Sequence, residues 1–597
     1  MRDLDVSNLL SALQGGQLSR RAFVRRVTSM GLSAASASIL AQSALAQPAT
    51  PLSATPAQSV TRSITRQEYL AAVQRAFPFE QPLTSGGHVL QALGNDIMTL
   101  NPVIAIDGFS AMMNVNIFSA LATPSVIDGS WVPDLADYWE VSADGTVYTF
   151  HLNPDATWHD GQPVTAHDCV FTLNAVLDES GLSGLQSSVA SVVRSYRAID
   201  DHTFELVAQR PVAVLFDKSI GGISIVPKHI WEPTPFSDWG AAPGATGADP
   251  SQVVGSGPFR FGERVREDHV SIIRNDDYWI PDLVPTIDRL TFRILPDTNA
   301  TVQSLQVGET DICYVPAGQF DVLQASHPEL SFTVYDDNGW INITMNGDPK
   351  LGTFFVDRRV RQAMLYALDR DLMVDVVFSG LGVRADGFYP PPSNAYAPER
   401  VTTIYNHDPD RARSLLDEAG WLEGDDGVRE KDGVTFKTEI LYGEAGPFSR
   451  QTVTYLQQAW REIGVDVETT AMPFPVLLER QSTGDFQIDL VSWSWLGDDM
   501  GLLYRCDALP PGGFNFARIC NPEFDRLNEE SLFELDPVKR RELLIAQGNI
   551  ANDDASLGLL LFSKSTYGSQ PRVRNLFANA YAGGIWSLPW MWIMDTE

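Results

Sequence analysis

Alternating helix and strand patterns between residues 408 and 493 constrain the fold more than any other feature. Asp408-Pro409-Asp410 is typical of a helix start, with an N-cap, a proline at the first helical position and an acidic first turn, and Gly420 marks its end. Apolar residues at helical spacing over 453–463 predict another helix. Strand patterns occupy 465–469 and 488–493. This succession predicts βαβ units with a partly parallel sheet, and therefore an α/β fold.

Other local patterns extend this picture toward the N-terminus. A hairpin is predicted over 139–152, where Asp-Gly supplies the turn, and Thr165 opens a helix with a capping box. A strand over 290–294 precedes a helix over 297–308, and apolar spacing over 360–372 indicates one further helix. A chain of 597 residues is too long for one core, so two or three folding units are expected.

The chain is strongly acidic. Lys and Arg total 43 against 75 Asp and Glu, which gives a formal net charge of −32, and 44% of the residues are hydrophobic. Such a surface repels phosphate backbones and anionic lipid headgroups, so nucleic acid and membrane surfaces are not expected partners. The acidity is interpreted as a solubility feature of a globular protein.

The first 46 residues resemble an export signal. Arg20 and Arg21 form a twin-arginine pattern ahead of a mildly apolar stretch, 27–45, which is too weakly apolar for a membrane-spanning helix. The stretch ends at a small-x-small site that predicts cleavage after Ala46. The alternative is a basic amphipathic helix. We expect export to the periplasm, and a Pro/Ser/Thr/Ala-rich linker with order beginning near residue 85.

The four cysteines allow one structural prediction. Cys506 and Cys520 bracket a turn-rich segment suited to a closed loop, and an oxidising compartment permits a disulfide between them. Cys169 and Cys313 are interpreted as buried small apolar residues. The first cysteine after the apolar stretch is Cys169, so no lipid anchor is expected. No CxxC pair indicates redox or metal chemistry.

Sequence motifs of catalysis and metal binding are absent or weak. The chain contains neither GxSxG nor HExxH. Gly255-Ser-Gly257-Pro258 is interpreted as a tight turn, because Pro lacks the N–H that a phosphate loop needs. His151, His159 and His167 recur at a spacing that suits no compact metal site. We predict no enzyme activity, no metal and no cofactor, although a catalytic carboxylate pair stays open.

One strand end carries candidate binding chemistry. The strand over 488–493 runs into Trp493, Trp495, Asp498 and Asp499. Carboxylates at the carboxyl end of such a strand face the crevice where open α/β sheets bind ligands, and indole faces attract cations. The alternative is that both Trp residues belong to the core and both Asp residues to a helix cap or solvated turn.

Several blocks in order between Val132 and Asp525 closely resemble the bacterial peptide- and nickel-type solute-binding proteins that serve ABC importers. Many of these blocks lie on predicted turns and hairpins, so we expect them to specify the fold rather than ligand contacts. The blocks are 132–152, 158–168, 254–261, 274–279, 292–297, 360–370, 408–421 and 521–525.

The resemblance implies an α/β, two-lobed periplasmic binding protein fold, with mixed sheets flanked by helices and an extra β-rich subdomain in lobe I. It also implies a hinge of two crossings, near Asp337–Met345 and Leu560–Thr566. The expected organisation is a signal peptide (1–46), a linker or N-terminal extension (47–84), the first part of lobe I (85–337), lobe II (338–560) and the return to lobe I (561–597).

The resemblance further implies a monomeric component of an ABC importer that captures a peptide or peptide-like amine and delivers it to a membrane permease. Asp498 is similar to the family aspartate that pairs with the ligand α-ammonium group, and Asp499 is the second choice. Trp493 and Trp495 are expected in the cleft wall, with Tyr442 near the ligand. The pair Cys506 and Cys520 also resembles a disulfide of dipeptide-binding members.

Two departures from the family bear on the cargo. Where dipeptide-binding members carry an Arg that clamps the ligand carboxylate, this chain has Tyr442-Gly-Glu-Ala445, and the loop after Asp498 is shorter. A longer peptide, held mainly through its backbone, fits a missing clamp better than a dipeptide. The alternatives are a nickel chelate, an opine-like or glycosyl compound, or, in another class, a secreted hydrolase.

Overall fold

The computed structural model describes residues between Thr61 and Met594. The predicted signal peptide, with Arg20, Arg21 and Ala46, lies outside the described residues. The described residues are 61–76, 85–127, 129–179, 183–212, 215, 221–351, 354–444, 449–494, 498–577 and 593–594.

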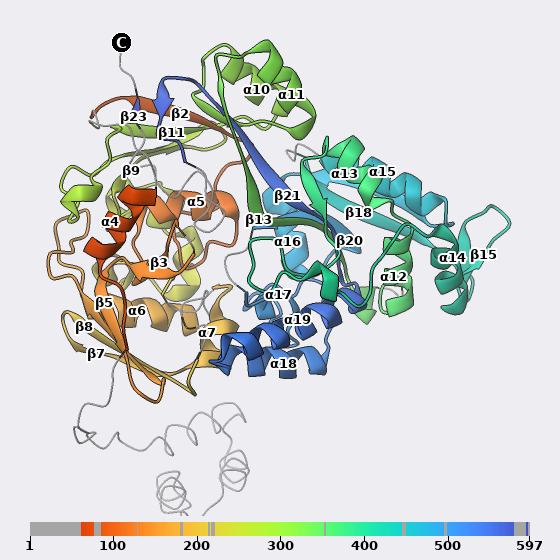
Figure 1. Cartoon of the computed structure of the whole chain (residues 1–597), viewed down its shortest axis with the longest axis horizontal. Coiled ribbons are helices and arrows are strands. Elements are labelled where there is room, and N and C mark those ends of the chain that lie inside the picture. The colour runs from red at the N-terminus through yellow and green to blue at the C-terminus, as the bar shows by residue number, and fades with distance from the viewer. Residues whose placement is uncertain are drawn as a thin grey trace, which may run out of the picture. The chain divides into compact units, whose positions relative to one another are not determined.

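Within the described residues, one mixed sheet of 11 strands runs through both lobes, in the order β19-β18-β20-β13-β21-β12-β2-β11-β10-β9, with β14 paired to β21. Two long central strands, β13 and β21, pair with each other and connect the two halves (Figure 1). The strands are β2 (His88–Leu93), β9 (Phe259–Val265), β10 (His269–Arg274), β11 (Arg289–Ile294), β12 (Ile312–Tyr314), β13 (Ser331–Met345), β14 (Gly382–Arg384), β18 (Lys437–Gly443), β19 (Asp466–Met472), β20 (Ile488–Ser494) and β21 (Leu557–Ser569).

In lobe II the predicted βαβ pattern is confirmed. β18 runs parallel to both β19 and β20, and helices α15 and α16 provide the two crossovers. Apolar residues of α15 and α16 pack on opposite faces of this sheet. The helices of lobe II are α12 (Arg358–Tyr366), α13 (Arg370–Val377), α14 (Pro409–Glu418), α15 (Ser449–Arg461), α16 (Phe474–Thr483), α17 (Gly501–Tyr504), α18 (Pro522–Phe533) and α19 (Pro537–Asp554), and a small ribbon comprises β15 (Leu422–Glu423), β16 (Arg429–Lys431) and β17 (Val434–Thr435).

The single helix expected over 360–372 is wrong. The structure has two helices there, because the Asp369 side chain accepts a hydrogen bond from the Leu372 N–H and caps a new helix, α13. Leu372, predicted to be apolar and inward, is exposed. By contrast, Asp408 caps α14 by accepting from the Arg411 N–H, as its motif predicts.

Lobe I contains a β-rich subdomain beside its part of the main sheet. The sheet order is β1-β5-β6-β8-β7, and the predicted hairpin forms β5 and β6, while Thr165 and Asp168 make the capping box of α6. The elements of lobe I are β1 (Thr61–Arg62), α4 (Arg66–Ala76), α5 (Gly108–Ile117), β3 (Ala122–Pro124), β4 (Trp131–Pro133), β5 (Ala136–Val141), β6 (Val147–Leu152), α6 (Ala166–Leu177), α7 (Gln186–Val192), β7 (Val193–Asp200), β8 (Thr203–Ala208), α8 (Lys228–Trp231), α9 (Pro243–Thr246), α10 (Thr298–Gln306), α11 (Ala317–Ser326), β22 (Val573–Arg574) and β23 (Ile593–Met594).

Residues 61–76 differ from the linker predicted for them. β1 pairs with β5, and α4 follows. Arg66 explains why this segment is held: its guanidinium lies 2.8 Å from the Asp137 carboxylate and 4.9 Å from the centre of the Trp279 ring. Both partners are remote in sequence, so local composition gave no sign of this contact.

Two of the family-like blocks hold each other in place. The Gly255 N–H donates to His159 Nδ1 at 3.1 Å, and His159 Nε2 lies 3.0 Å from the Gly257 carbonyl oxygen. Burial lowers the pKa of His159 to about 4, so the ring stays neutral. A β-carbon on Gly255 would lie 2.0 Å from the Ile117 carbonyl oxygen, so this position requires glycine. These blocks therefore serve the fold.

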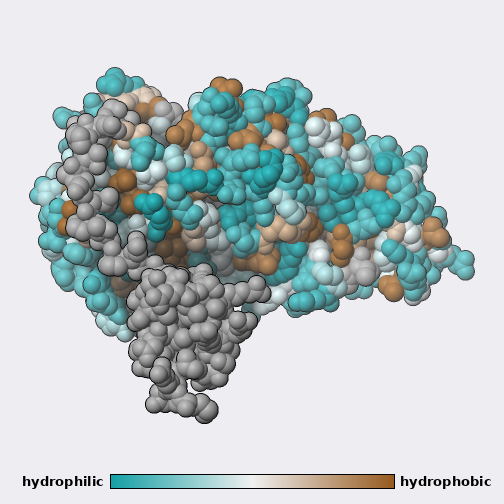
Figure 2. Space-filling model, turned by 90° about the horizontal axis from the view of Figure 1, so that it is seen from below, coloured by the Kyte–Doolittle hydropathy of each residue, from teal (hydrophilic) through white to brown (hydrophobic). Residues whose placement is uncertain are grey.

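The surface view in Figure 2 is mostly hydrophilic, with apolar side chains in small separate patches. Among residues 61–594 that the structure describes, no helix combines the length and apolar character needed to cross a bilayer.

A buried carboxyl group in the lobe II sheet predicts a pH-dependent stability. Asp489 is fully buried on β20, accepts from Gln481 Nε2 at 2.8 Å, and burial raises its pKa to about 7. Its folded-state pKa exceeds the unfolded value, so its stabilising contribution is complete below pH ~4 and is lost as the pH rises toward 7, at about 1.4 kcal/mol per pH unit.

Asp489→Asn should remove this slope. Urea denaturation at pH 5, 6, 7 and 8 would show the wild type losing stability relative to the variant up to pH ~7, with a constant difference above it. The exposed Asp410→Asn serves as the matched control. Parallel pH profiles of wild type and Asp489→Asn would contradict the assignment.

Candidate functional site

The carboxyl ends of three parallel strands define one edge of the lobe II sheet. β18, β19 and β20 end at Gly443, Met472 and Ser494, and parallel pairing brings these ends to the same edge. Ligands of open α/β sheets bind beyond such an edge. The chain segment that leaves β20 there carries the candidate residues Asp498 and Asp499.

An aromatic cluster lies next to this edge. The Trp493 ring on β20 lies 5.6 Å from the Phe514 ring and 5.8 Å from the Phe516 ring, between ring centres. Phe514 also packs against lobe I, because a β-carbon on Gly184 would lie 2.5 Å from its ring. Trp493 is partly buried in this cluster, and its role in the cleft wall stays a prediction.

Asp498 is buried at the same edge and is held by groups remote in sequence. Ser393 Oγ donates to Asp498 Oδ1 at 2.6 Å. Arg540 Nη1 lies 4.0 Å from Asp498 Oδ2, and the side chains of Arg540 and Asp498 are 16% and 8% exposed. A carboxylate that is largely removed from water gains most from a cationic or hydrogen-bonding partner.

Asp499 has a different environment. Its Oδ1 accepts from the Gly501 N–H at 2.8 Å and from Asn528 Nδ2 at 3.0 Å. Asn528 lies 3.2 Å, Nδ2 to Oε1, from Gln547 on α19. Asp499 thus connects α17, α18 and α19, which favours a structural role over a ligand contact.

The remaining predicted site residues are placed as follows. Tyr442 lies on β18, and its side chain belongs to the apolar core of lobe II. Trp495 lies outside the described residues. The ligand-contact roles of Tyr442 and Trp495 stay predictions.

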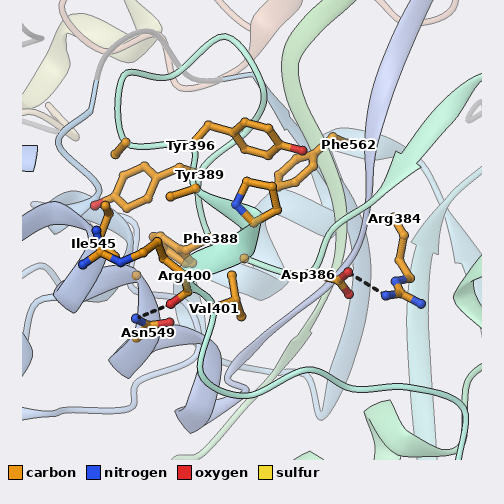
Figure 3. A pocket seen from close by; sticks show the side chains of 15 residues that line it. Arg384, Asp386, Phe388, Tyr389, Tyr396, Arg400, Val401, Ile545, Asn549 and Phe562 are labelled. Carbon is orange, nitrogen blue, oxygen red and sulfur yellow. Dashed lines mark hydrogen bonds and ion pairs between the residues drawn. The ribbon is translucent and has the colours of Figure 1, made fainter. Parts of the chain in front are cut away.

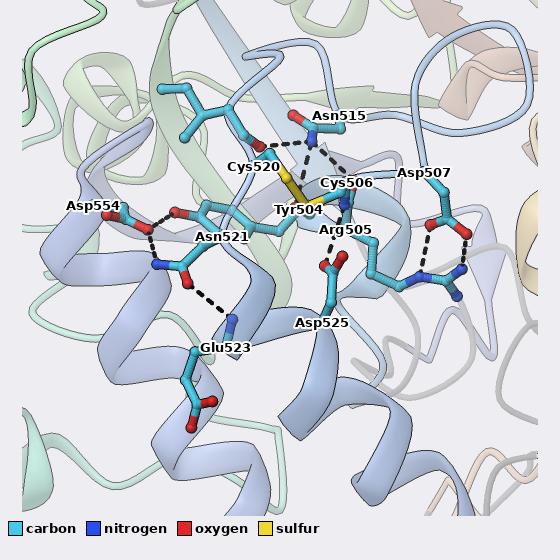
Figure 4. The surroundings of a disulfide bond; sticks show 11 residues. Tyr504, Arg505, Cys506, Asp507, Asn515, Cys520, Asn521, Glu523, Asp525 and Asp554 are labelled. Carbon is cyan, nitrogen blue, oxygen red and sulfur yellow. Dashed lines mark hydrogen bonds and ion pairs between the residues drawn. A yellow bond between two sulfur atoms is a disulfide. The ribbon is translucent and has the colours of Figure 1, made fainter.

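A disulfide joins Cys506 and Cys520, the pair that the closed-loop interpretation selects (Figure 4). Asn515, inside the loop, donates to the carbonyl oxygens of Arg505 at 3.0 Å and Ile519 at 2.9 Å. The Gly512 carbonyl oxygen accepts from the Ser187 N–H of α7 in lobe I at 3.2 Å. The loop therefore forms part of the contact between the lobes. Cys169 and Cys313 are free and buried.

Replacing both Cys506 and Cys520 with serine should lower the free energy of unfolding by about 3 kcal/mol, because the cross-link closes a loop over a sequence separation of 14. Urea denaturation measures this loss. Reductant should destabilise the wild type by a similar amount and leave the double variant unchanged. An equal effect of reductant on both proteins would contradict the prediction.

A small, partly open pocket lies in lobe II between the 384–401 segment and α19 (Figure 3). Its walls include the rings of Phe388, Tyr389, Tyr396 and Phe562, and the Arg384–Asp386 ion pair lies at one end. The Tyr389 ring lines this pocket, while Asp498 and Asp499 act on its hydroxyl and, after burial, raise its pKa. Tyr389 therefore lines the pocket and is also within electrostatic range of Asp498.

Sequence reasoning missed Ser393, Tyr389 and Arg540, because only the tertiary fold brings them to Asp498. Among the residues that the structure describes, no three His, Cys, Asp or Glu side chains gather as metal ligands. His159 is used by the Gly255–Gly257 turn, and His151 stacks on Tyr138 with ring centres 4.4 Å apart.

Two lobes joined by paired strands, with a buried carboxylate and an aromatic cluster at a strand-end edge, define a solute-binding protein of the two-lobed periplasmic type. The sequence matches the bacterial extracellular solute-binding proteins, family 5 (middle region), over residues 130–508. The chain belongs to this family.

Known relatives agree with this assignment. The chain is 25% identical over 392 residues to the oligopeptide-binding protein AppA of Bacillus subtilis, covering 65% of this chain and 70% of AppA. It is 25% identical over 461 residues to the dipeptide-binding protein of Escherichia coli, covering 73% and 81%. The structure of AppA in complex with a nonapeptide superimposes with a TM-score of 0.80 at 21% identity, covering 86% of this chain and 100% of AppA. NikZ from Campylobacter jejuni in complex with Ni(L-His) gives a TM-score of 0.73 at 20% identity, covering 85% and 99%.

Proposed function

We propose that this protein is the periplasmic solute-binding component of an ABC importer and captures a peptide or peptide-like amine between its lobes. The observation that carries the proposal is the buried Asp498 carboxylate at the carboxyl end of a parallel strand, next to the Trp493–Phe514–Phe516 cluster. A carboxylate in that position suits the α-ammonium group of a peptide. The relatives that bind peptides support this choice of cargo.

The proposal also covers the export route of the protein and its oligomeric state. Export uses the twin-arginine signal at Arg20 and Arg21, with cleavage after Ala46 and without a lipid anchor. The mature protein acts as a monomer that delivers its cargo to membrane permease subunits and has no catalytic activity of its own.

The cargo is proposed to be longer than a dipeptide. At the family position of the carboxylate clamp the chain has Tyr442-Gly-Glu-Ala445 and no Arg, so one end of a dipeptide would have no partner. A longer peptide contributes backbone hydrogen bonds along its length, which are independent of side-chain identity.

The test is native mass spectrometry of protein purified from the periplasm, followed by fluorescence titration with a synthetic peptide pool. We expect co-purified masses that correspond to peptides, and recovery of the pool uncleaved. A thermal shift that requires nickel and a chelator, without peptide binding, would show that the cargo is a metal chelate and not a peptide. Cleavage of the pool by purified protein would make the protein a hydrolase.

A further inference from the structure

We propose that Arg540 is a built-in counter-ion of the Asp498 carboxylate and weakens the preference of the site for an amine. This inference rests on the proposed function, because it takes Asp498 as the contact for the cargo amine. It adds a specificity-determining residue from α19, whereas Asp498 lies between β20 and α17.

The geometry around the carboxylate supports this role. Arg540 Nη1 stands 4.0 Å from Asp498 Oδ2, whereas a charge-assisted hydrogen bond between such groups is ~2.8 Å long. The charges therefore attract across the gap without this nitrogen donating directly to Oδ2. Ser393 Oγ donates to the other oxygen at 2.6 Å. The approach to Oδ2 is thus the side on which a cargo amine would compete with Arg540.

The position of Arg540 near the N-terminus of α19 also concerns the charge at this site. Three consecutive cations lie close to the N-terminus of α19, where the helix dipole disfavours positive charge. They are Lys539, Arg540 and Arg541. Arg541 compensates by donating to the carbonyl oxygens of Asn394 at 2.9 Å and Tyr396 at 3.2 Å, next to Ser393. The start of α19 therefore holds both the Ser393 segment and the charge opposite Asp498.

An unpartnered hydroxyl lies beside the same charges. Tyr389 is 4% exposed, and its hydroxyl has no hydrogen-bond partner among the described residues, although Asp498, Asp499 and Arg540 all act on it electrostatically. A buried hydroxyl without a partner costs free energy, so the site has hydrogen-bonding capacity that a bound cargo or water can use.

The consequence concerns selectivity. A lone buried carboxylate would favour any cation strongly, but a guanidinium nearby already compensates its charge and repels a second cation. Removing the Arg540 charge should therefore increase the preference for a free amine over a neutral amide at the same end of the cargo.

The experiment measures the affinities of one pentapeptide pool in two forms, with free and N-acetylated amino termini. Arg540→Gln should raise the ratio of free to acetylated affinity about tenfold. Arg540→Lys keeps the charge and should leave the ratio within about twofold of the wild type. The surface variant Arg526→Gln removes one half-exposed charge whose ion-pair partners are Glu523 and Glu530, and it should change nothing. Thermal melting checks that every variant is folded.

The outcomes separate the two proposals. If Asp498→Asn reduces the ratio to near one while Arg540→Gln leaves it at the wild-type value, the amine contact stands and the counter-ion role is wrong. If Asp498→Asn itself leaves the ratio unchanged, the proposed amine contact fails and the role of Arg540 fails with it. If Arg540→Lys raises the ratio as much as Arg540→Gln, the charge is not the cause and the counter-ion role is overturned.

Discussion

Replacing Asp498 with asparagine should lower the affinity for peptides with a free amino terminus by about 100-fold, which corresponds to about 3 kcal/mol. The side chain is 8% exposed, so an ammonium group bound there is removed from water together with the carboxylate. Asparagine keeps the shape and the acceptor for Ser393 but removes the charge. Isothermal titration with a peptide pool, free or N-acetylated, measures the effect, and acetylated peptides should lose little.

Asp499→Asn is the matched control. It removes the same charge one residue away, but Asp499 already accepts from the Gly501 N–H and Asn528. We expect this variant to lower thermal stability while the free-to-acetylated affinity ratio stays near the wild-type value. A selective loss of amine binding in Asp499→Asn, with Asp498→Asn unaffected, would move the amine contact to Asp499.

Replacing Arg370 with methionine should destabilise lobe II by about 4 kcal/mol. Arg370 is 2% exposed, and burial lowers its pKa to about 10. Its guanidinium donates to the carbonyl oxygens of Ala385, Leu559 and Tyr405, and to the Asp386 carboxylate. Methionine fills similar volume but leaves these buried acceptors without their donor.

Urea denaturation followed by tryptophan fluorescence measures this loss. Arg400→Met is the control, because Arg400 pairs with Glu542 on the surface and such pairs contribute at most about 1 kcal/mol. Arg370→Lys should also destabilise the protein, since one ammonium group cannot reach four acceptors. Equal stabilities of Arg370→Met and Arg400→Met would contradict the central role assigned to Arg370.

The sequence predicted helices that begin at a capping residue whose hydrogen-bond partner lies in the same helix. Thr165 and Asp168 form the capping box of α6, and Asp408 caps α14. These predictions succeed because the cap and its partner are three residues apart, so the interaction is fully contained in the pattern. The break between α12 and α13 was missed, because the apolar spacing continued through the Asp369 cap.

The sequence did not predict contacts between segments that are distant along the chain. Arg66 holds α4 through Asp137 and Trp279, and Arg370 collects carbonyl oxygens from three separate segments. An arginine with buried backbone acceptors looks the same in a sequence as a solvated one. The partners become neighbours only when the sheet and its helices assemble.

The residues of the candidate site also differ in whether the sequence could predict them. Asp498 could be proposed from the sequence through its similarity to the family aspartate, because its position after a strand with two tryptophans left a helix cap or solvated turn open. Ser393 and Arg540 could not, since they belong to the segment between β14 and α14 and to the start of α19. The sequence could therefore indicate the carboxylate, but not Ser393 and Arg540, which interact with it.

The register shift between β13 and β21 has a mechanical consequence. The two strands pair from Ser331 to Asp336 and again from Trp340, the ladder is interrupted between these stretches, and the register shifts once more between Ile341 and Asn342. A ribbon with an interruption bends there while both paired stretches keep their hydrogen bonds. Bending at residues 337–339 would then leave both paired stretches intact, so a change in the angle between them would cost few backbone hydrogen bonds.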